Sequence, residues 1–244
     1  MRILCTGWYG TETLGDRAIL LGIIQLLGFV ERQVELSLLS INPFFSERIV
    51  NEDIPLILKL YPETSIRLDI YDAKSLRQTF KALKTADLVI MGGGPLMDLE
   101  EVFMVESIFS AAKLLNKPCF VFGCGIGPLQ NPRYERSVSN ILRLSNYSVL
   151  RDSKSFEHAK RMGLKNISYA LDPAFHLAVR YNEYLDLTQC LTKEDSVVLN
   201  IREVSPEYAS YNQEYYNKLI QILGSIIESH PGLKIVMQPM NYFH

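Results

Sequence analysis

The stretch DLVIMGGGPLMD, residues 87–98, decides the fold, because a run of buried-strand formers stops there at three glycines and a proline. A second stretch, FVFGCGIGPL at residues 120–129, repeats this pattern further along the chain. In an open parallel sheet, ligands bind outside the carboxyl ends of the strands, and glycine there lets backbone N–H groups approach a ligand. The two stretches therefore predict two strand ends that line one cleft.

Short apolar runs alternate with longer helical patterns over most of the chain. We expect strands at residues 2–7, 34–40, 66–71, 87–92, 119–125, 147–151 and 167–171. Helices are expected between them, at about 17–30, 45–60, 73–84, 99–116, 132–145 and 153–162. Strands that are apolar throughout and are separated by helices indicate a doubly wound α/β domain, with a parallel sheet covered on both faces.

The alternation breaks after residue 175 and resumes at SVVLNIR, residues 196–202, before a helix at about 208–229 and a strand in LKIVMQPM, residues 233–240. We therefore expect an N-terminal Rossmann-like domain over residues 1–178, a linker over 179–195 and the start of a second Rossmann-like domain over 196–244. A single strand–helix–strand unit cannot bury both faces of its sheet. The second domain is thus expected to be truncated, or to take the rest of its core from a partner.

Composition excludes several classes of protein. Apolar residues make up 48% of the chain and charged residues 21%, which is typical of a globular protein with a real core. The net charge of −2 provides no general basic field for nucleic acid or anionic lipid, although local patches can exist within such a total. The longest apolar run, AILLGIIQLLGFV at residues 18–30, is shorter than the roughly 20 residues that span a bilayer.

The four cysteines are scattered without CxxC pairing, at Cys5, Cys119, Cys124 and Cys190. Three of them lie in or beside apolar strand-like segments. This pattern favours reduced, buried thiols and a reducing compartment, and it shows no metal cluster.

A third glycine-rich loop, GWYGTETLGD at residues 7–16, joins the first expected strand to the first helix. It ends in Asp16, a candidate N-cap of a helix whose amino end favours anions. Arg151 and Asp152 lie at the end of the expected strand 147–151, and Asp172 lies after the expected strand 167–171, just before Pro173. Because carboxyl ends of parallel strands share one edge, the sequence predicts that these polar groups and the glycines gather there.

Most of these residues also have a structural interpretation. Asp16 and Asp152 suit ordinary helix caps, and Asp172 suits the turn before a proline. Trp8 could stack on a sugar ring or cover the core. Arg151 closes an apolar strand, so its guanidinium must lie either in water or against an anion.

The segment GCGIGP at residues 123–128 does not meet the dinucleotide fingerprint. That motif needs GxGxxG opening a helix after the first strand, and an acidic residue closing the second. Here the glycines follow a later strand, a proline interrupts them, and the second strand ends in LLSIN. NAD binding is therefore disfavoured.

Five ordered motifs together resemble the polysaccharide pyruvyl transferase family. They are GxxGxxxxGDxAIL from residue 7, DLVIMGGG, FGCGIGPL, VLRDSKSFEHAKRMGL and LDPAF. The resemblance runs from about residue 3 to residue 175 and continues faintly into SVVLNIR and IVMQPM. It implies a GT-B-like fold and a reaction in which phosphoenolpyruvate supplies pyruvate, as a cyclic ketal, to a sugar of a cell-surface polysaccharide or its precursor.

The resemblance also implies roles for individual residues. Arg151 corresponds to the arginine that helps hold the donor and Asp16 to an aspartate of the active site, so these two are the candidate catalytic residues. The candidate substrate-binding residues are Gly7, Trp8, Gly10, Gly92, Gly93, Gly94, Gly125, Gly127, Asp172 and Arg202. We expect no metal and no cofactor, and we expect as partners phosphoenolpyruvate and a sugar acceptor, free or lipid-linked, with no nucleic acid. A cytoplasmic location is expected, extending to the inner membrane face.

Two features depart from the family pattern. Leu14 stands where the family usually has an asparagine, and the sequence ends before the paired arginine and histidine of the family's second domain. His244 is the last residue and is not assigned that role. Two hypotheses stay open: an amino-terminal part of a pyruvyl transferase, impaired as given, or a non-catalytic sugar- or nucleotide-binding module or GT-B-like glycosyltransferase relative.

Overall fold

The computed structural model describes residues 1–11, 13–60, 65–177, 196–200 and 209–237. The chain divides into two compact units, Met1–Tyr184 and Leu185–His244, and each unit has its own sheet. The division falls within the expected linker, residues 179–195, which lies outside the described residues. None of the described helices is both long enough and apolar enough to cross a membrane.

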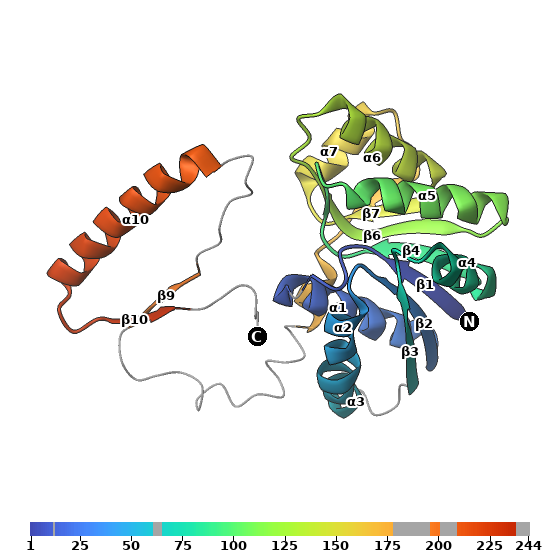
Figure 1. Ribbon diagram of the computed structural model, residues 1–244, viewed down its shortest axis with the longest axis horizontal. Coiled ribbons are helices and arrows are strands. Elements are labelled where there is room, and N and C mark those ends of the chain that lie inside the picture. The colour runs from blue at the N-terminus through green and yellow to red at the C-terminus, as the bar shows by residue number, and fades with distance from the viewer. Residues whose placement is uncertain (12, 61–64, 178–195, 201–208, 238–244) are drawn as a thin grey trace. The chain divides into compact units, whose positions relative to one another are not determined.

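A parallel sheet forms the centre of the first unit (Figure 1). Its strands run in the order β3-β2-β1-β4-β6-β7-β8, and every pairing is parallel. They are β1 Arg2–Thr6, β2 Gln33–Ser40, β3 Ser65–Asp72, β4 Leu88–Gly92, β6 Cys119–Ile126, β7 Tyr147–Leu150 and β8 Ile167–Tyr169; a short β5, Pro95–Leu96, also pairs with β6. The order reverses between β1 and β4, as in doubly wound sheets, so the predicted α/β fold is confirmed.

The central strands are apolar on both faces because both faces are covered. In β4, Val89 and Met91 belong to one core cluster and Ile90 belongs to the other, as the alternation of side chains along a strand requires. In β1, Leu4 and Cys5 divide between the two clusters in the same way. These strands therefore read as continuous apolar runs in the sequence.

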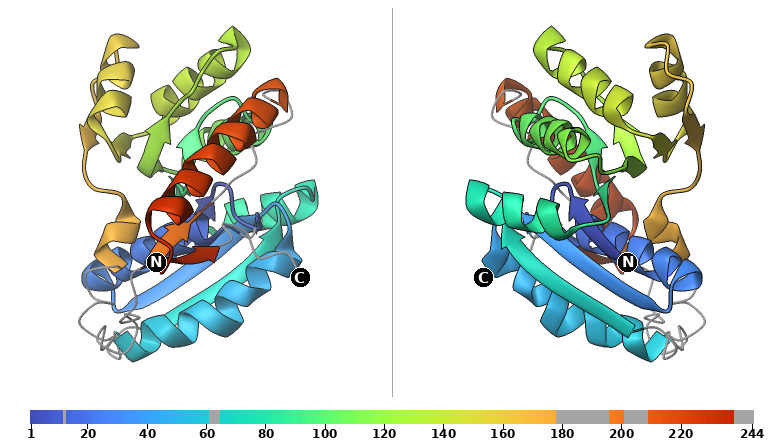
Figure 2. Two further views of the ribbon diagram at one scale, coloured as in Figure 1. Left: turned by 90° about the vertical axis from the view of Figure 1, so that its left-hand side faces the viewer. Right: turned by 90° about the vertical axis from the view of Figure 1, so that its right-hand side faces the viewer.

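Helices cover the two faces in two groups (Figures 1 and 2). One face carries α1 Leu14–Val30, α2 Pro43–Arg48, the π-helical turn η1 Ile49–Asp53 and α3 Ile54–Leu60. The other carries α4 Leu76–Thr85, α5 Glu101–Leu114, α6 Pro132–Leu144 and α7 Ser153–Arg161. The expected helix at 45–60 is thus a run of three segments that begins at Pro43 and contains a π turn.

The helix starts show which capping expectations hold. Asp152 is the N-cap of α7, since its Oδ1 accepts from the Ser155 N–H at 2.7 Å. The expectation that Asp16 caps α1 is wrong, because the helix begins at Leu14 and Thr13 occupies the N-cap position. Asp16 lies instead within the first turn, where an acidic side chain interacts favourably with the helix dipole.

The second unit contains a strand–helix–strand arrangement in its described residues. β9 Ser196–Leu199 and β10 Lys234–Met237 pair in parallel, with Val197 opposite Ile235. The helix α10, Ala209–Ser229, connects them in sequence. This is the βαβ order expected for the start of a second Rossmann-like domain.

Trp8 and Tyr9, in the loop after β1, pack directly on the glycines that end β4. A Cβ on Gly94 would overlap Trp8 Cδ1, and a Cβ on Gly93 would lie 3.2 Å from the Tyr9 hydroxyl. The Trp8 Nε1–H donates to the Pro95 carbonyl at 2.9 Å, and the two aromatic residues are only 5% and 1% exposed. The point where the strand order reverses is therefore filled by the chain's own aromatic rings.

Replacing Gly94 should destabilise the protein through a clash as well as through its backbone conformation. Gly94 has φ +69°, and Gly163, at the end of α7, has φ +78° with no atom within 4 Å of the position that a Cβ would occupy. Gly163→Ala should cost about 1 kcal/mol of unfolding free energy for the left-handed conformation alone. Gly94→Ala should cost about 1–3 kcal/mol more, because Trp8 must move. Urea denaturation of both variants measures the difference, and equal losses would contradict the packing described.

Candidate functional site

The carboxyl ends of the strands share one edge of the sheet, because all of the strands are parallel. Asp16 follows β1, Gly94 follows β4, Gly125 lies near the end of β6 and Arg151 follows β7. Since β4 and β6 separate β1 from β7, about 14 Å of sheet lies between the first and last of these strand ends, at about 4.8 Å per strand. These four residues thus lie on one edge of the sheet, in two parts of it.

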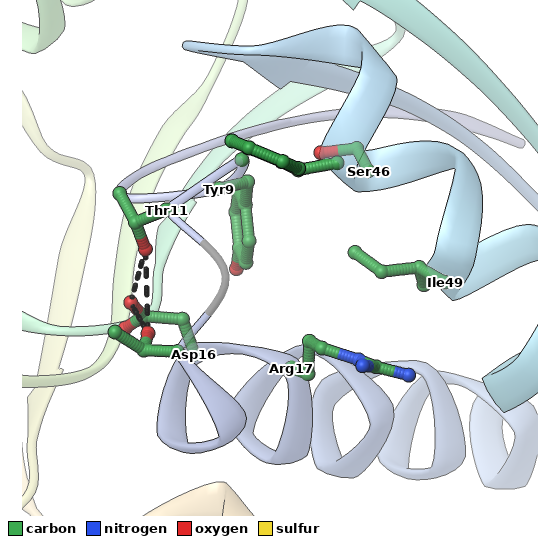
Figure 3. Close-up of a pocket in the computed structure, with 9 residues that line it drawn as sticks. Tyr9, Thr11, Asp16, Arg17, Ser46 and Ile49 are labelled. Carbon is green, nitrogen blue, oxygen red and sulfur yellow. Dashed lines mark hydrogen bonds between the residues drawn. The ribbon is translucent and has the colours of Figure 1, made fainter. Parts of the chain in front are cut away.

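Asp16 borders a small hollow between the loop after β1 and the helical segment after β2 (Figure 3). The Thr11 hydroxyl donates to Asp16 Oδ2 at 3.0 Å, and the Thr13 hydroxyl donates to the same oxygen. Two hydroxyls therefore hold this carboxyl group in one orientation. The sequence held a signal for this arrangement, because Thr13 and Asp16 have the spacing of a capping box.

Arg17 borders the same hollow, and acidic residues of η1 hold its guanidinium. Its Nε donates to Asp53 Oδ2 at 2.8 Å, while its Nη2 donates to Asp53 Oδ1 at 2.6 Å and to Glu52 Oε2 at 2.8 Å. Hydrogen bonding to Asp53 raises the pKa of Arg17, and hydrogen bonds from Arg48 and then Arg17 lower the pKa of Glu52. Figure 3 shows the Arg17 side chain directed away from Asp16. Arg17, which the sequence analysis did not single out, therefore fastens α1 to η1.

The hollow itself is small. Its cavity volume is about 10 Å³, and its lining includes Tyr9, Thr11, Asp16, Arg17 and Ser46. This volume accommodates about one water molecule. A sugar ring or a phosphorylated acid does not fit inside it, so Asp16 can meet such a ligand only from the open side of the edge.

Arg151 extends from the end of β7 and lies over Gly125 of β6. A Cβ on Gly125 would lie 2.9 Å from Arg151 Nε, so the absence of a side chain there leaves room for the guanidinium. Arg151 Nη1 donates to Asp172 Oδ2 at 3.2 Å, with the two side chains 30% and 18% exposed. Asp172 Oδ1 also accepts from the Ala174 N–H at 2.9 Å. Asp172 therefore shapes its own turn and orients Arg151.

Most of the donors of Arg151 have no partner among the residues that the structure describes. A guanidinium has five N–H groups. Among the residues that the structure describes, Asp172 is the only hydrogen-bond partner of this side chain. The arginine is therefore partly buried and held in place, and it retains donors that suit a carboxylate or phosphate.

Asp98 joins the two glycine-rich loops and was not anticipated. Its Oδ2 accepts from the Gln130 N–H at 2.8 Å and from the Asn131 N–H at 3.1 Å. Nearby, the Gly127 N–H donates to the Leu96 carbonyl at 2.8 Å. The signal for this role in the sequence was the position of Asp98 as the last residue of MGGGPLMD. These bonds fix the loop after β6 against the loop after β4.

The remaining predicted binding residues lie mostly in internal contacts. A Cβ on Gly7 would overlap the Gly92 carbonyl oxygen, and a Cβ on Gly10 would lie 2.5 Å from the Asn42 N. Trp8 packs in the core, so of its two interpretations the structure shows core cover. Arg202 lies outside the described residues. The glycines near β1 and β4 thus permit close packing of the chain on itself.

Two thiols and a phenol are buried beneath this edge. The Cys5 thiol donates to the Tyr9 hydroxyl at a sulfur–oxygen distance of 3.5 Å. Burial raises the pKa of Cys5 to about 12 and that of Cys124 to about 12, although nearby Arg151 lowers the latter. Burial also raises the pKa of Tyr9. All three groups are neutral at pH 7, so the thiols are structural and not nucleophilic.

Comparison with known sequences finds a matching family and a curated relative. The family described as polysaccharide pyruvyl transferase matches residues 14–242. A curated relative is the amylovoran biosynthesis protein AmsJ of Erwinia amylovora, 24% identical over 264 residues that cover 93% of this chain and 63% of the relative. The chain thus spans less than two thirds of the length of that relative.

Two solved structures share the fold. The UDP-GlcNAc 2-epimerase from Neisseria meningitidis, bound to UDP-GlcNAc, has a TM-score of 0.61 and 13% identity, covering 98% of this chain and 66% of its own. A putative UDP-N-acetylglucosamine 2-epimerase from Listeria monocytogenes has a TM-score of 0.62 and 10% identity, covering 97% and 61%. At these identities the likeness shows the fold alone, and it agrees with a Rossmann-like, GT-B-type architecture.

The buried acids predict a loss of stability in alkaline solution. A group whose folded-state pKa is raised keeps its stabilising effect below its unfolded pKa and loses it as the pH rises toward the folded value. For Cys5 and Cys124 this window runs from the ordinary value of 9.0 to about 12. The raised pKa of each thiol should thus lower the free energy of unfolding by about 1 kcal/mol as the pH rises to 10.

Urea denaturation at pH 8 and pH 10 measures this loss. Cys124→Ala is the control, because it removes the Cys124 thiol and leaves the Cys5 thiol in place. Its loss between the two pH values should be smaller than that of the unaltered protein. Identical losses in the two proteins would show that the Cys124 thiol does not titrate in this way.

Proposed function

Because the chain belongs to the polysaccharide pyruvyl transferase family, we propose that the complete protein transfers pyruvate from phosphoenolpyruvate to a sugar, as a cyclic ketal. The acceptor is a sugar of a cell-surface polysaccharide or of its precursor, free or lipid-linked. The relationship to a protein of amylovoran biosynthesis supports a role in exopolysaccharide assembly. The reaction is cytoplasmic in this proposal, where phosphoenolpyruvate is available.

The proposed reaction balances without a cofactor. The methylene carbon of phosphoenolpyruvate gains a proton, two sugar hydroxyl oxygens bond to the adjacent carbon, and the bond from that carbon to the phosphate oxygen breaks. One hydroxyl proton is in effect retained on the new methyl group, and the other leaves with phosphate. The protein therefore needs an anion clamp, an acid and a base, and the chemistry compels no metal.

Arg151 carries the proposal. Its guanidinium is partly buried at the edge of the sheet, Asp172 orients it, and Gly125 leaves space for it. Phosphoenolpyruvate places a carboxylate and a phosphate close together, and a held arginine fork suits either group. In the proposal Arg151 binds the donor. Asp172 sets the orientation of Arg151 and does not touch the donor, since a second carboxylate would repel it.

In the proposal Asp16 acts on a hydroxyl group of the acceptor sugar. Two threonine hydroxyls fix its carboxyl group at the part of the edge that follows β1, and the hollow beside it excludes a ligand from that side. A carboxylate in this position can orient or deprotonate a sugar hydroxyl. Arg202, outside the described residues, is proposed to add positive charge from the second domain.

Incubation of the full-length protein with phosphoenolpyruvate and a panel of sugar acceptors tests the proposal. Phosphate release that depends on the acceptor, with a product whose mass matches a pyruvate ketal, is the expected result. Asp16→Asn should lower turnover far more than it lowers the melting temperature, because it removes the charge and keeps the shape. Consumption of a nucleotide sugar, with no phosphate released from phosphoenolpyruvate, would instead favour a glycosyltransferase-like relative.

Arg151→Ala should weaken the binding of phosphoenolpyruvate by about 2–4 kcal/mol, the range for loss of a charge-assisted partner. Isothermal calorimetry with the full-length protein measures this affinity. Arg77→Ala is the matched control, because Arg77 is an exposed arginine at the start of α4, beside the outermost strand β3 and five strands away from β7. Unchanged donor affinity in Arg151→Ala, or an equal loss in Arg77→Ala, would refute the clamp role.

A further inference from the structure

The charge of the chain is distributed unevenly. Residues 132–165, which include α6 and α7, contain eight Lys and Arg and three Asp and Glu, so this segment has a net charge of +5. The whole chain has a net charge of −2, which leaves −7 for the remaining residues. Residues 132–165 therefore carry a net positive charge, whereas the rest of the chain carries a net negative charge.

The packing of α6 and α7 directs most of these charges outward. Both helices bury residues in one core cluster, including Val138 and Ile141 of α6 and Ala159 of α7. Their opposite sides therefore face away from the sheet. Six of the seven exposed basic residues of these helices and of the turn after α7 define what we call the basic face, Arg133 being set over the Phe103 ring: Arg136, Arg143, Lys154, Lys160, Arg161 and Lys165.

The two helices that carry the basic face lie on the same side of the sheet (Figure 1). Arg143 Nη2 donates to the Met162 carbonyl at 2.9 Å and so links α6 to the end of α7. Arg143 also lines two shallow surface hollows, one shared with Arg136 and the other with Lys165. These contacts make one surface out of basic residues that are separated in sequence.

Few acidic groups neutralise this surface. Glu135 and Glu157 lie in its hollows, while Glu106 of α5 is turned toward α6, where it accepts from Ser137 at 2.5 Å and from Asn140 at 2.7 Å. Within the part of the chain that the structure describes, Arg136, Lys160 and Arg161 form no ion pair. Their charges are therefore available to an external partner.

We propose that the basic face docks on a membrane surface that contains anionic lipid. Each Lys or Arg close to such a surface contributes about 1 kcal/mol, and the attraction acts within about a Debye length, roughly 8 Å at physiological salt. Charges at the surface therefore dominate binding even though the whole chain is negative. The net −7 elsewhere is repelled, which orients the basic face toward the membrane. This inference deepens the proposed function, since it rests on an acceptor held at a membrane.

Nucleic acid fits these observations less well. Nucleic-acid-binding domains usually have an isoelectric point above about 9, whereas the value for this chain is about 6.1. A planar anionic surface needs no such overall positive charge, because its attraction acts locally.

Flotation of the full-length protein with vesicles tests the proposal. Vesicles of phosphatidylcholine with an equal part of phosphatidylglycerol should bind the protein at low salt, and vesicles of phosphatidylcholine alone should not. Binding should fall steeply between about 50 mM and about 500 mM salt, because screening weakens each contact. Absence of binding to the anionic vesicles at low salt would overturn the proposal.

Two triple variants locate the interaction. Arg136→Gln, Lys160→Gln and Arg161→Gln together should weaken vesicle binding on the order of 100-fold, from about 5-fold per residue. The control removes three exposed basic residues in and just before α4, as Lys74→Gln, Arg77→Gln and Lys84→Gln, and should retain binding. Both variants have the same net charge, so equal weakening would overturn the assignment to the basic face. Tighter binding of duplex DNA than of vesicles, lost in the first variant, would overturn the choice of partner.

The transfer assay separates this inference from the proposed function. With a water-soluble acceptor, the first variant should keep full phosphate release, because none of its changes lies at the edge that carries Arg151. Loss of vesicle binding with activity retained supports the docking surface alone. Failure of the unaltered protein to transfer pyruvate, with vesicle binding intact, would count against the function and not against the surface.

Discussion

The contact between the aromatic pair Trp8–Tyr9 and the glycine triplet Gly92–Gly94 is the constraint on which the edge of the sheet depends. It closes the point where the strand order reverses, with rings that are almost wholly buried. The loop after β1 is thereby fixed, and Asp16 follows from it at the start of α1. Any side chain on Gly94 competes with Trp8 for the same space, so two distant segments of sequence depend on each other.

The rest of the edge is organised by the same kind of close approach. Gly125 makes room for Arg151 as Gly94 does for Trp8, but here the neighbour is a charged group that retains donors. The edge therefore contains one part sealed by aromatic rings and one part open to an anion. This difference explains why glycines that look alike in sequence take different roles, and it concentrates the proposed binding of the donor around β6, β7 and β8.

The fold was predictable because it follows from periodicity. Apolar runs such as LVIMG mark strands buried on both faces, and the Asp152 cap was readable from its place before α7. Partners distant in sequence were not predictable: nothing local indicates that Arg17 meets Asp53, or that Asp98 holds Gln130. The start of α1 was misplaced because Asp16 and Thr13 are both good capping residues, and the observed helix uses the earlier one.

The π turn η1 makes the spacing of its segment as important as its composition. The backbone N–H of Ile54 donates to the carbonyl of Ile49, and within this wider turn Glu52 and Asp53 both reach Arg17. Deleting one residue would remove the extra residue of this turn and restore ordinary helical winding. One of the two carboxylates would then leave the arginine. Length variation is therefore less tolerable between Pro43 and Leu60 than the exposed position of much of this segment suggests.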